Sequence, residues 1–112
     1  MAIIVDIDNT IVRNGNQPIQ KNIDYINQLG ERKIIITGRV ESQRNETISM
    51  LKSIGFTYSR LIMNPYSTSD SNKHKKEAAS KLTDIVLAID DNPVARRAYN
   101  SLGIKTMNPA SI

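Results

Sequence analysis

Residues 3–12 read IIVDIDNTIV, an apolar run that is interrupted by two carboxylates, Asp6 and Asp8. A short apolar run bounded by polar residues is typical of a strand buried on both faces of a parallel sheet. Asp6 and Asp8 would then follow the carboxyl end of that strand, at the edge where open α/β sheets bind ligands. The alternative interpretation is an ordinary acidic turn after a strand.

Two neighbouring acids at such an edge repel each other and are costly to desolvate together, which indicates a cation between them. Mg²⁺ suits this position, because it is commonly held by one or two carboxylates together with phosphate and water. An aspartate beside a metal ion and a phosphoryl group can also act as a nucleophile and form an aspartyl-phosphate.

The chain has 112 residues, no cysteine and a formal net charge of +4. This length predicts a single domain, residues 1–112, with a core of its own. The absence of cysteine excludes a disulfide framework and a thiolate metal site. No apolar stretch approaches the roughly 20 residues of a membrane span and no signal-peptide pattern is present, so we expect a cytoplasmic protein. The positive charge modestly favours a polyanionic partner such as nucleic acid.

Strand and helix patterns alternate along the rest of the chain. Apolar runs predict four more strands, at 33–37, 60–63, 85–89 and 104–107. Helical spacing predicts four helices, beginning at Pro18, at Glu41 or Ser42, at Lys73 and at Pro93. In the second helix, Ile48, Leu51 and Ile54 are expected to face the sheet. The alternation predicts a three-layer α/β/α sandwich around a mostly parallel, Rossmann-like sheet of five strands.

The notable polar clusters also follow predicted strands. Thr37, Gly38 and Arg39 follow the second strand, and Asp90 with Asp91 follows the fourth. Because the carboxyl ends of parallel strands share one edge of the sheet, we expect these residues to converge with the first acid pair on one site.

Taken together, DIDNTIV at 6–12, TGR at 37–39, a lysine-rich helix start and DD at 90–91 resemble the four ordered motifs of the haloacid dehalogenase (HAD) superfamily of phosphotransferases. The resemblance spans residues 3–91. It implies a HAD-like fold and a Mg²⁺-dependent phosphatase, a phosphoric monoester hydrolase. An Asp rather than an apolar residue at position 8 favours a phosphatase over a dehalogenase.

The resemblance implies the roles of the first two acids. Asp6 would attack phosphorus through one oxygen and bind Mg²⁺ through the other. Asp8 would protonate the leaving oxygen, later deprotonate the attacking water, and bind the metal through its main-chain carbonyl. A nucleophile must stay ionised, whereas an acid must carry a proton near neutral pH, so the division is chemically consistent.

The resemblance also implies the remaining site residues. The Thr37 hydroxyl and the Gly38 N–H would hold phosphoryl oxygens, and Asp90 and Asp91 would complete the metal site. Arg39, directly after this turn, would either contact a second phosphate of the substrate or form a surface salt bridge.

A lysine would neutralise the charge that the phosphate shares with Asp6. We assign this role to Lys75, with Lys73 and Lys76 as alternatives. Three further polar residues are expected at the surface: His74, Arg96 and Arg97. For His74 the alternative is contact with the substrate.

The intervals between the motifs have no room for a cap domain, so the site should be open. An open site suits a bulky substrate such as a nucleic-acid end or a phosphoprotein, or else a site that a neighbouring subunit covers, which keeps oligomerisation open. The loop 66–72 is polar and aperiodic, and could be either a substrate-binding flap or a disordered connection.

Within the superfamily, KKE at 75–77, LAIDDN at 87–92 and LGI at 102–104 resemble the 3′-phosphatase domain of phage-type polynucleotide kinase, although this chain has no kinase domain. We therefore expect a polynucleotide 3′-phosphatase or a nucleotide phosphatase. The alternatives are a catalytically silent HAD-fold binding module and a receiver-type phosphoacceptor domain. The receiver is disfavoured, because the DD pair follows the fourth strand rather than the first.

Overall fold

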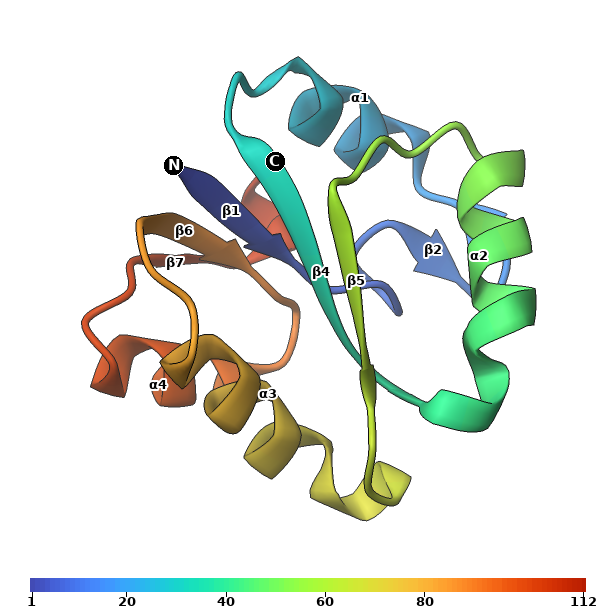
Figure 1. The fold of residues 1–112 in the computed structure, drawn as a ribbon. Coiled ribbons are helices and arrows are strands. Elements are labelled where there is room, and N and C mark those ends of the chain that lie inside the picture. The colour runs from blue at the N-terminus through green and yellow to red at the C-terminus, as the bar shows by residue number, and fades with distance from the viewer.

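Five parallel strands form the central sheet of the computed structural model, which describes residues 1–112 (Figure 1). In spatial order they are β5 (Arg60–Asn64), β4 (Arg32–Val40), β1 (Ala2–Val5), β6 (Ile85–Ile89) and β7 (Thr106–Met107). Every neighbouring pair in this order is parallel. The order places β1 in the middle of the sheet, so the acids that follow it lie at the centre of the carboxyl edge.

Four helices form the two outer layers. Helices α1 (Gln20–Gln28) and α2 (Arg44–Ser53) cover one face of the sheet, and α3 (Ser71–Ser80) and α4 (Pro93–Ser101) cover the other (Figure 1). Short 3₁₀ turns occur at Glu41–Gln43, Thr68–Asp70 and Pro109–Ser111. With helices on both faces of the sheet, the predicted three-layer α/β/α class is confirmed.

None of the helices has the length and apolar character needed to cross a membrane.

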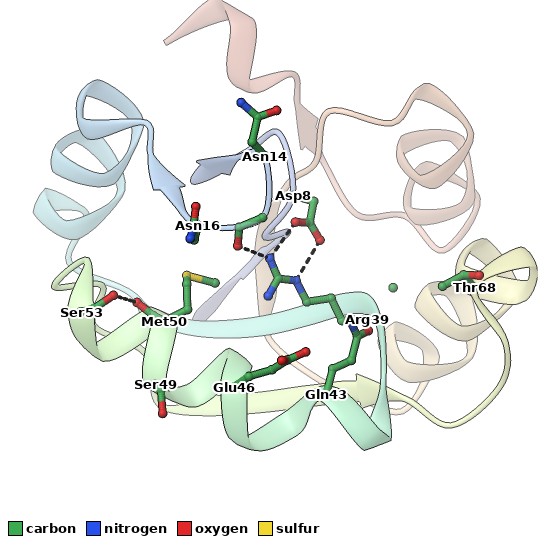
Figure 2. Close-up of a pocket in the computed structure, with 12 residues that line it drawn as sticks. Asp8, Asn14, Asn16, Arg39, Gln43, Glu46, Ser49, Met50, Ser53 and Thr68 are labelled. Carbon is green, nitrogen blue, oxygen red and sulfur yellow. Dashed lines mark hydrogen bonds and ion pairs between the residues drawn. The ribbon is translucent and has the colours of Figure 1, made fainter.

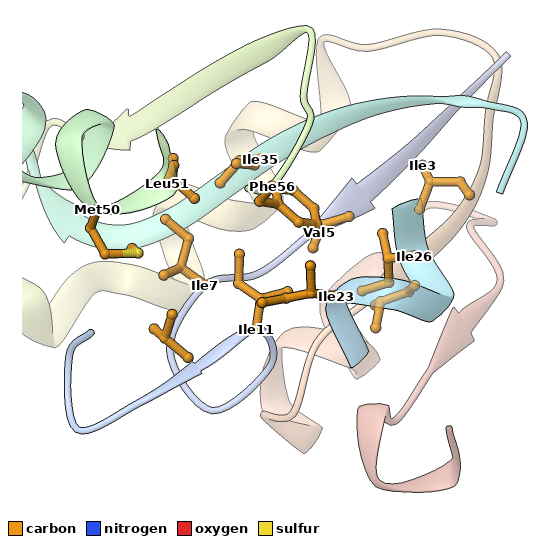
Figure 3. Close-up of a cluster of buried hydrophobic side chains, with 12 residues drawn as sticks. Ile3, Val5, Ile7, Ile11, Ile23, Ile26, Ile35, Met50, Leu51 and Phe56 are labelled. Atoms are coloured by element: carbon orange, nitrogen blue, oxygen red, sulfur yellow. The ribbon is translucent and has the colours of Figure 1, made fainter. Parts of the chain in front are cut away.

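The side chains of β1 divide between two hydrophobic clusters, because successive residues of a strand point to opposite faces. Ile3 and Val5 pack in the cluster beneath α1 and α2 (Figure 3). Ala2 and Ile4 pack in a second cluster with α3 and α4. All four residues are buried. Burial on both faces explains why this strand is a continuous apolar run.

The segment 12–18 differs from the prediction that a helix begins at Pro18. Val12–Arg13 (β2) pairs with Gln17–Pro18 (β3) in a two-stranded antiparallel hairpin. The Ile19 N–H donates to the Ile11 carbonyl at 2.8 Å, which keeps the chain extended past the proline. Helix α1 consequently begins only at Gln20.

The sheet-facing side of α2 also differs from the prediction. Thr47, Met50 and Leu51 are buried and Ile54 packs partly against the same cluster, whereas Ile48 is 40% exposed. Positions 47, 50, 51 and 54 form one helical face, and position 48 lies beside it. The prediction for Ile48 was wrong because Thr47, a polar residue, occupies the buried position.

This arrangement gives a matched pair of stability predictions on one helix. Leu51→Ala should lower the free energy of unfolding by about 2–5 kcal/mol, because it leaves a cavity under α2. Ile48→Ala should change it by less than about 0.5 kcal/mol, as for other surface substitutions. Urea unfolding followed by circular dichroism measures both, and equal losses would contradict the assigned helix face.

Candidate active site

The carboxyl ends of β1 and β6 bring two acids to a single buried lysine. The Lys75 Nζ donates to Asp6 Oδ1 at 3.0 Å and to Asp90 Oδ2 at 2.7 Å. The Thr10 hydroxyl donates to the other oxygen of Asp6, Oδ2, at 3.0 Å. All four side chains are buried. The two oxygens of Asp6 are thereby held in a fixed orientation.

Of the three candidate lysines, Lys75 alone reaches these acids. Helix α3 turns Lys75 toward the sheet edge, while Lys73 and Lys76 are exposed. The Lys73 ammonium instead lies 4.7 Å from the centre of the Tyr66 ring. The three lysines are close in sequence, but the helical period directs only Lys75 toward the acids.

Asp91 lies beside the same cluster. One carboxylate oxygen from each of Asp6, Asp90 and Asp91 lies within 4.8 Å of the others. The Asn92 N–H donates to Asp90 Oδ1 at 2.9 Å. The Arg96 Nη1 donates to the main-chain carbonyls of Asp90 and Asp91, both at 2.9 Å. These contacts fix the backbone that carries the two acids.

The prediction that Arg96 is simply solvated was therefore wrong. Arg96 lies in the first turn of α4, where the helix dipole disfavours a cation. An arginine at such a position indicates that its side chain has a specific partner. In this protein the partners are the two carbonyls that precede the helix.

Burial dominates the electrostatics of this cluster. Desolvation raises the pKa of Asp6 to about 6. It also raises the pKa of Asp90 to about 6, with a further contribution from the negative charge of Asp6. Burial lowers the pKa of Lys75, but the charges of Asp6 and Asp90 outweigh burial and raise it overall. Lys75 therefore stays an ammonium while the acids ionise close to neutral pH.

The acidic cluster fits a divalent cation. Asp6 and Asp90 share the Lys75 ammonium and Asp91 adds a third carboxylate, so two negative charges are unbalanced when all three acids are ionised. Carboxylate oxygens are hard ligands of the kind that Mg²⁺ and Ca²⁺ prefer. These three residues are the ones that would hold the metal.

Asp8 lines the same crevice as Asp6 and Lys75, but its carboxylate pairs with Arg39 (Figure 2). The Arg39 Nε donates to Asp8 Oδ2 at 3.0 Å and Nη2 donates to Asp8 Oδ1 at 2.8 Å. Nη2 also donates to the Gly15 carbonyl at 2.8 Å, in the turn of the hairpin. The Arg39 side chain is only 13% exposed. Of the two alternatives for Arg39, the salt bridge is the one present, and its partner Asp8 is 48% exposed.

Thr37 and Gly38 lie within β4, which continues past the predicted end to Val40. The buried Thr37 hydroxyl accepts the Arg39 N–H at 3.1 Å. A Cβ on Gly38 would lie 2.8 Å from the Cβ of Ser71, at the start of α3. Only glycine therefore allows α3, which carries Lys75, to approach β4 this closely.

His74 differs from a surface position, whereas residues 66–70 of the loop are exposed. His74 is buried under α3, its Nε2 has no hydrogen-bond partner, and burial lowers its pKa. The expectation of a surface histidine was wrong, because His74 lies with Lys75 and Ala79 among the buried residues of α3. The loop forms a 3₁₀ turn before α3, and Ser71 lines the crevice that holds Asp6 and Lys75.

No protein-family model and no curated protein sequence matches this chain. Among solved structures, a chain of the Pnkp1/Rnl/Hen1 RNA repair complex is similar, with 22% identity and a TM-score of 0.75. The similarity covers 96% of this chain and 41% of that one. This chain thus spans about two fifths of that protein.

The glycerol phosphate phosphatase Rv1692 from Mycobacterium tuberculosis is also similar, in complexes with calcium and with magnesium. Both have 18% identity over 95% of this chain, with TM-scores of 0.47 and 0.43, and the similarity covers 30% and 31% of the respective chains. The likeness to the RNA repair protein shows a shared fold over nearly the whole chain. The predicted α/β/α fold around a Rossmann-like parallel sheet of five strands is confirmed.

A bound divalent cation should stabilise the protein in a pH-dependent manner. Asp6 and Asp90 take up protons as the pH falls through about 6, and a protonated carboxyl competes poorly for a cation. At a pH well above 6, Mg²⁺ should therefore raise Tm. At a Mg²⁺ concentration of 100 times Kd, the stabilisation should be equivalent to about 2.7 kcal/mol. This increment should be lost as the pH is lowered through 6. Thermal melts with and without Mg²⁺ measure it.

The matched controls replace one acid by its amide. Asp90→Asn should remove most of the Mg²⁺ increment, whereas Asp24→Asn, on the exposed side of α1, should retain it. An increment that is the same at pH 5 as at pH 7.5, or that survives in Asp90→Asn, would show that the metal binds elsewhere.

Proposed function

We propose that this chain is a Mg²⁺-dependent phosphomonoester hydrolase in which Asp6 forms an aspartyl-phosphate. The observation that carries this proposal is the fixed orientation of the buried Asp6, between Lys75 and Thr10 and beside the acids of the metal cluster. A preorganised nucleophile next to a buried cation is the arrangement that phosphoryl transfer to a carboxylate requires.

In the first step, an Asp6 oxygen bonds to phosphorus and the bond from phosphorus to the ester oxygen breaks. Asp8 supplies the proton that the leaving oxygen takes. In the second step, water attacks phosphorus, Asp8 accepts its proton, and Asp6 is released with inorganic phosphate. Thr37 and Gly38 hold the phosphoryl oxygens during both steps, and Lys75 neutralises their charge. When bound, Mg²⁺ supplies further neutralisation between the phosphate and the carboxylates.

Arg39 sets a condition on this mechanism. It donates to both oxygens of Asp8, which is a contact to the ionised carboxylate. Asp8 can deliver a proton only after this contact loosens. Arg39 is therefore a positioning residue in the free protein, and substrate entry shifts the Asp8 carboxyl from Arg39 to the leaving oxygen.

The proposed substrate is a phosphate on a nucleic-acid 3′-end or on a nucleotide. Three observations support this choice: the fold similarity to a protein of an RNA repair complex, the net charge of +4, and the absence of a cap over the site. A site without a cap suits a substrate whose own body covers it.

The strand order argues against the receiver-type alternative. Counting only the five strands of the main sheet in chain order, the spatial order is 3-2-1-4-5. Receiver domains have the order 2-1-3-4-5. The silent binding module differs from the proposed enzyme only in turnover, so turnover decides between them.

Phosphate release from a 3′-phosphorylated oligonucleotide tests the proposal. Activity should require Mg²⁺ and should fall to background in Asp6→Asn, which lacks the nucleophile. Asp8→Asn should lose about 10²–10⁴-fold in kcat/KM, the usual contribution of a general acid. Asp24→Asn is the control and should retain full activity. A protein that binds the oligonucleotide but releases no phosphate would be the silent binding module.

The substrate class is tested with the same assay on a panel. A 3′-phosphorylated oligonucleotide or a nucleoside monophosphate should have a higher kcat/KM than a 5′-phosphorylated oligonucleotide or a small sugar phosphate. The reverse order would contradict the proposed substrate but not the phosphatase chemistry.

A further inference from the structure

A groove of about 820 Å³ lies beside Asp8 and Arg39, between the turn of the β2–β3 hairpin and α2 (Figure 2). Its size is within the range of about 300–1,000 Å³ found for small-molecule pockets. Met50 is the only hydrophobic residue that lines it. The proposed mechanism uses Asp8, Gly38 and Arg39 from its lining and assigns no role to the other residues.

The groove adjoins the crevice that contains Asp6 and Lys75. Asp8 and Gly38 line both cavities. A phosphoryl group held between Asp6 and Gly38 would therefore lie at the boundary between the crevice and the groove.

The direction of the reaction points the leaving group into the groove. The attacking and leaving oxygens lie roughly in line on opposite sides of phosphorus. Asp6 attacks from the crevice, so the leaving oxygen faces away from it. Asp8, which protonates that oxygen, must come within about 2.6–3.2 Å of it. Asp8 borders the groove, so the rest of the leaving group extends there.

The lining indicates what kind of group fits. Most of its side chains are uncharged amides and hydroxyls, at Asn14, Asn16, Gln43, Ser49, Ser53 and Thr68. The single cation, Arg39, is already paired with Asp8, and Glu46 adds a negative charge. A further phosphate would have no free cation there. No aromatic ring lines the groove, so it offers no side chain on which a base could stack.

We propose that this groove is the leaving-group subsite of the phosphatase, and that its amides and hydroxyls bind the hydroxyl groups of a ribose-type sugar. This inference rests on the proposed function. It places the terminal sugar of a 3′-phosphorylated substrate in the groove and the next phosphate of a nucleic-acid strand outside it.

A bulky side chain in the groove tests the assignment kinetically. Ser49 is exposed on α2 and lines the groove, so Ser49→Tyr should fold and fill part of it. The probes are a ribonucleoside 3′-monophosphate and acetyl phosphate, whose leaving group has only two carbons. Ser49→Tyr should lower the ratio of their kcat/KM values, nucleotide over acetyl phosphate, by about tenfold or more. Ser101→Tyr, at an exposed position of α4, should leave the ratio unchanged.

A binding measurement makes the test independent of turnover. In Asp6→Asn, NMR titration with the ribonucleoside 3′-monophosphate should shift the side-chain amides of Asn14, Asn16 and Gln43. Inorganic phosphate should shift the backbone amide of Gly38 without moving those side chains.

The two readouts separate the possible failures. An unchanged kcat/KM ratio in Ser49→Tyr, or a nucleotide that shifts Gly38 but no groove amide, would overturn the subsite while the proposed function stands. If the wild-type protein with Mg²⁺ hydrolyses neither of these two substrates, the proposed function fails, and the titration still decides whether the groove binds the sugar. A nucleotide that shifts neither set of amides would overturn the subsite as well.

Discussion

The Lys75 ammonium, buried between the carboxylates of Asp6 and Asp90, is the contact on which the site depends. Breaking a buried ion pair by removing one partner typically costs about 3–5 kcal/mol, because the other charge is left without compensation. That is a large share of the roughly 5–15 kcal/mol by which a domain is stable. The same contact joins α3 to the ends of two strands. The orientation of Asp6 and the packing of α3 against the sheet therefore both depend on the Lys75 side chain.

Much of the fold was predictable from sequence, because a parallel sheet covered on both faces leaves a simple pattern. Ile3 to Val5 and Ile85 to Ile89 read as apolar runs since every position is at least partly buried. Residues that follow such runs are carried to one edge by topology alone. This is why the convergence of Asp6 and Asp90 could be expected. Lys75 could be preferred among three lysines, but only the inward face of α3 separates it from Lys73 and Lys76.

The remaining features depend on contacts between distant segments. Arg39 and Asp8 are 31 residues apart in sequence, and nothing local indicates that they pair. The hairpin forms because Ile19 bonds to Ile11, which overrides the preference of Pro18 for a helix start. The burial of Thr47 in place of Ile48 likewise follows from how α2 is seated on the sheet, since the helical period alone permits either face.

The close approach of Gly38 to Ser71 limits how this sequence can drift during evolution. Even an alanine at position 38 would put a Cβ 2.8 Å from that of Ser71 and would force the start of α3 outward. Lys75 is one turn further along that helix, so it would move as well. The position is therefore constrained by the packing of α3 against β4. An alanine would keep the backbone N–H, so the packing of α3 and the resulting position of Lys75 are what require glycine at position 38.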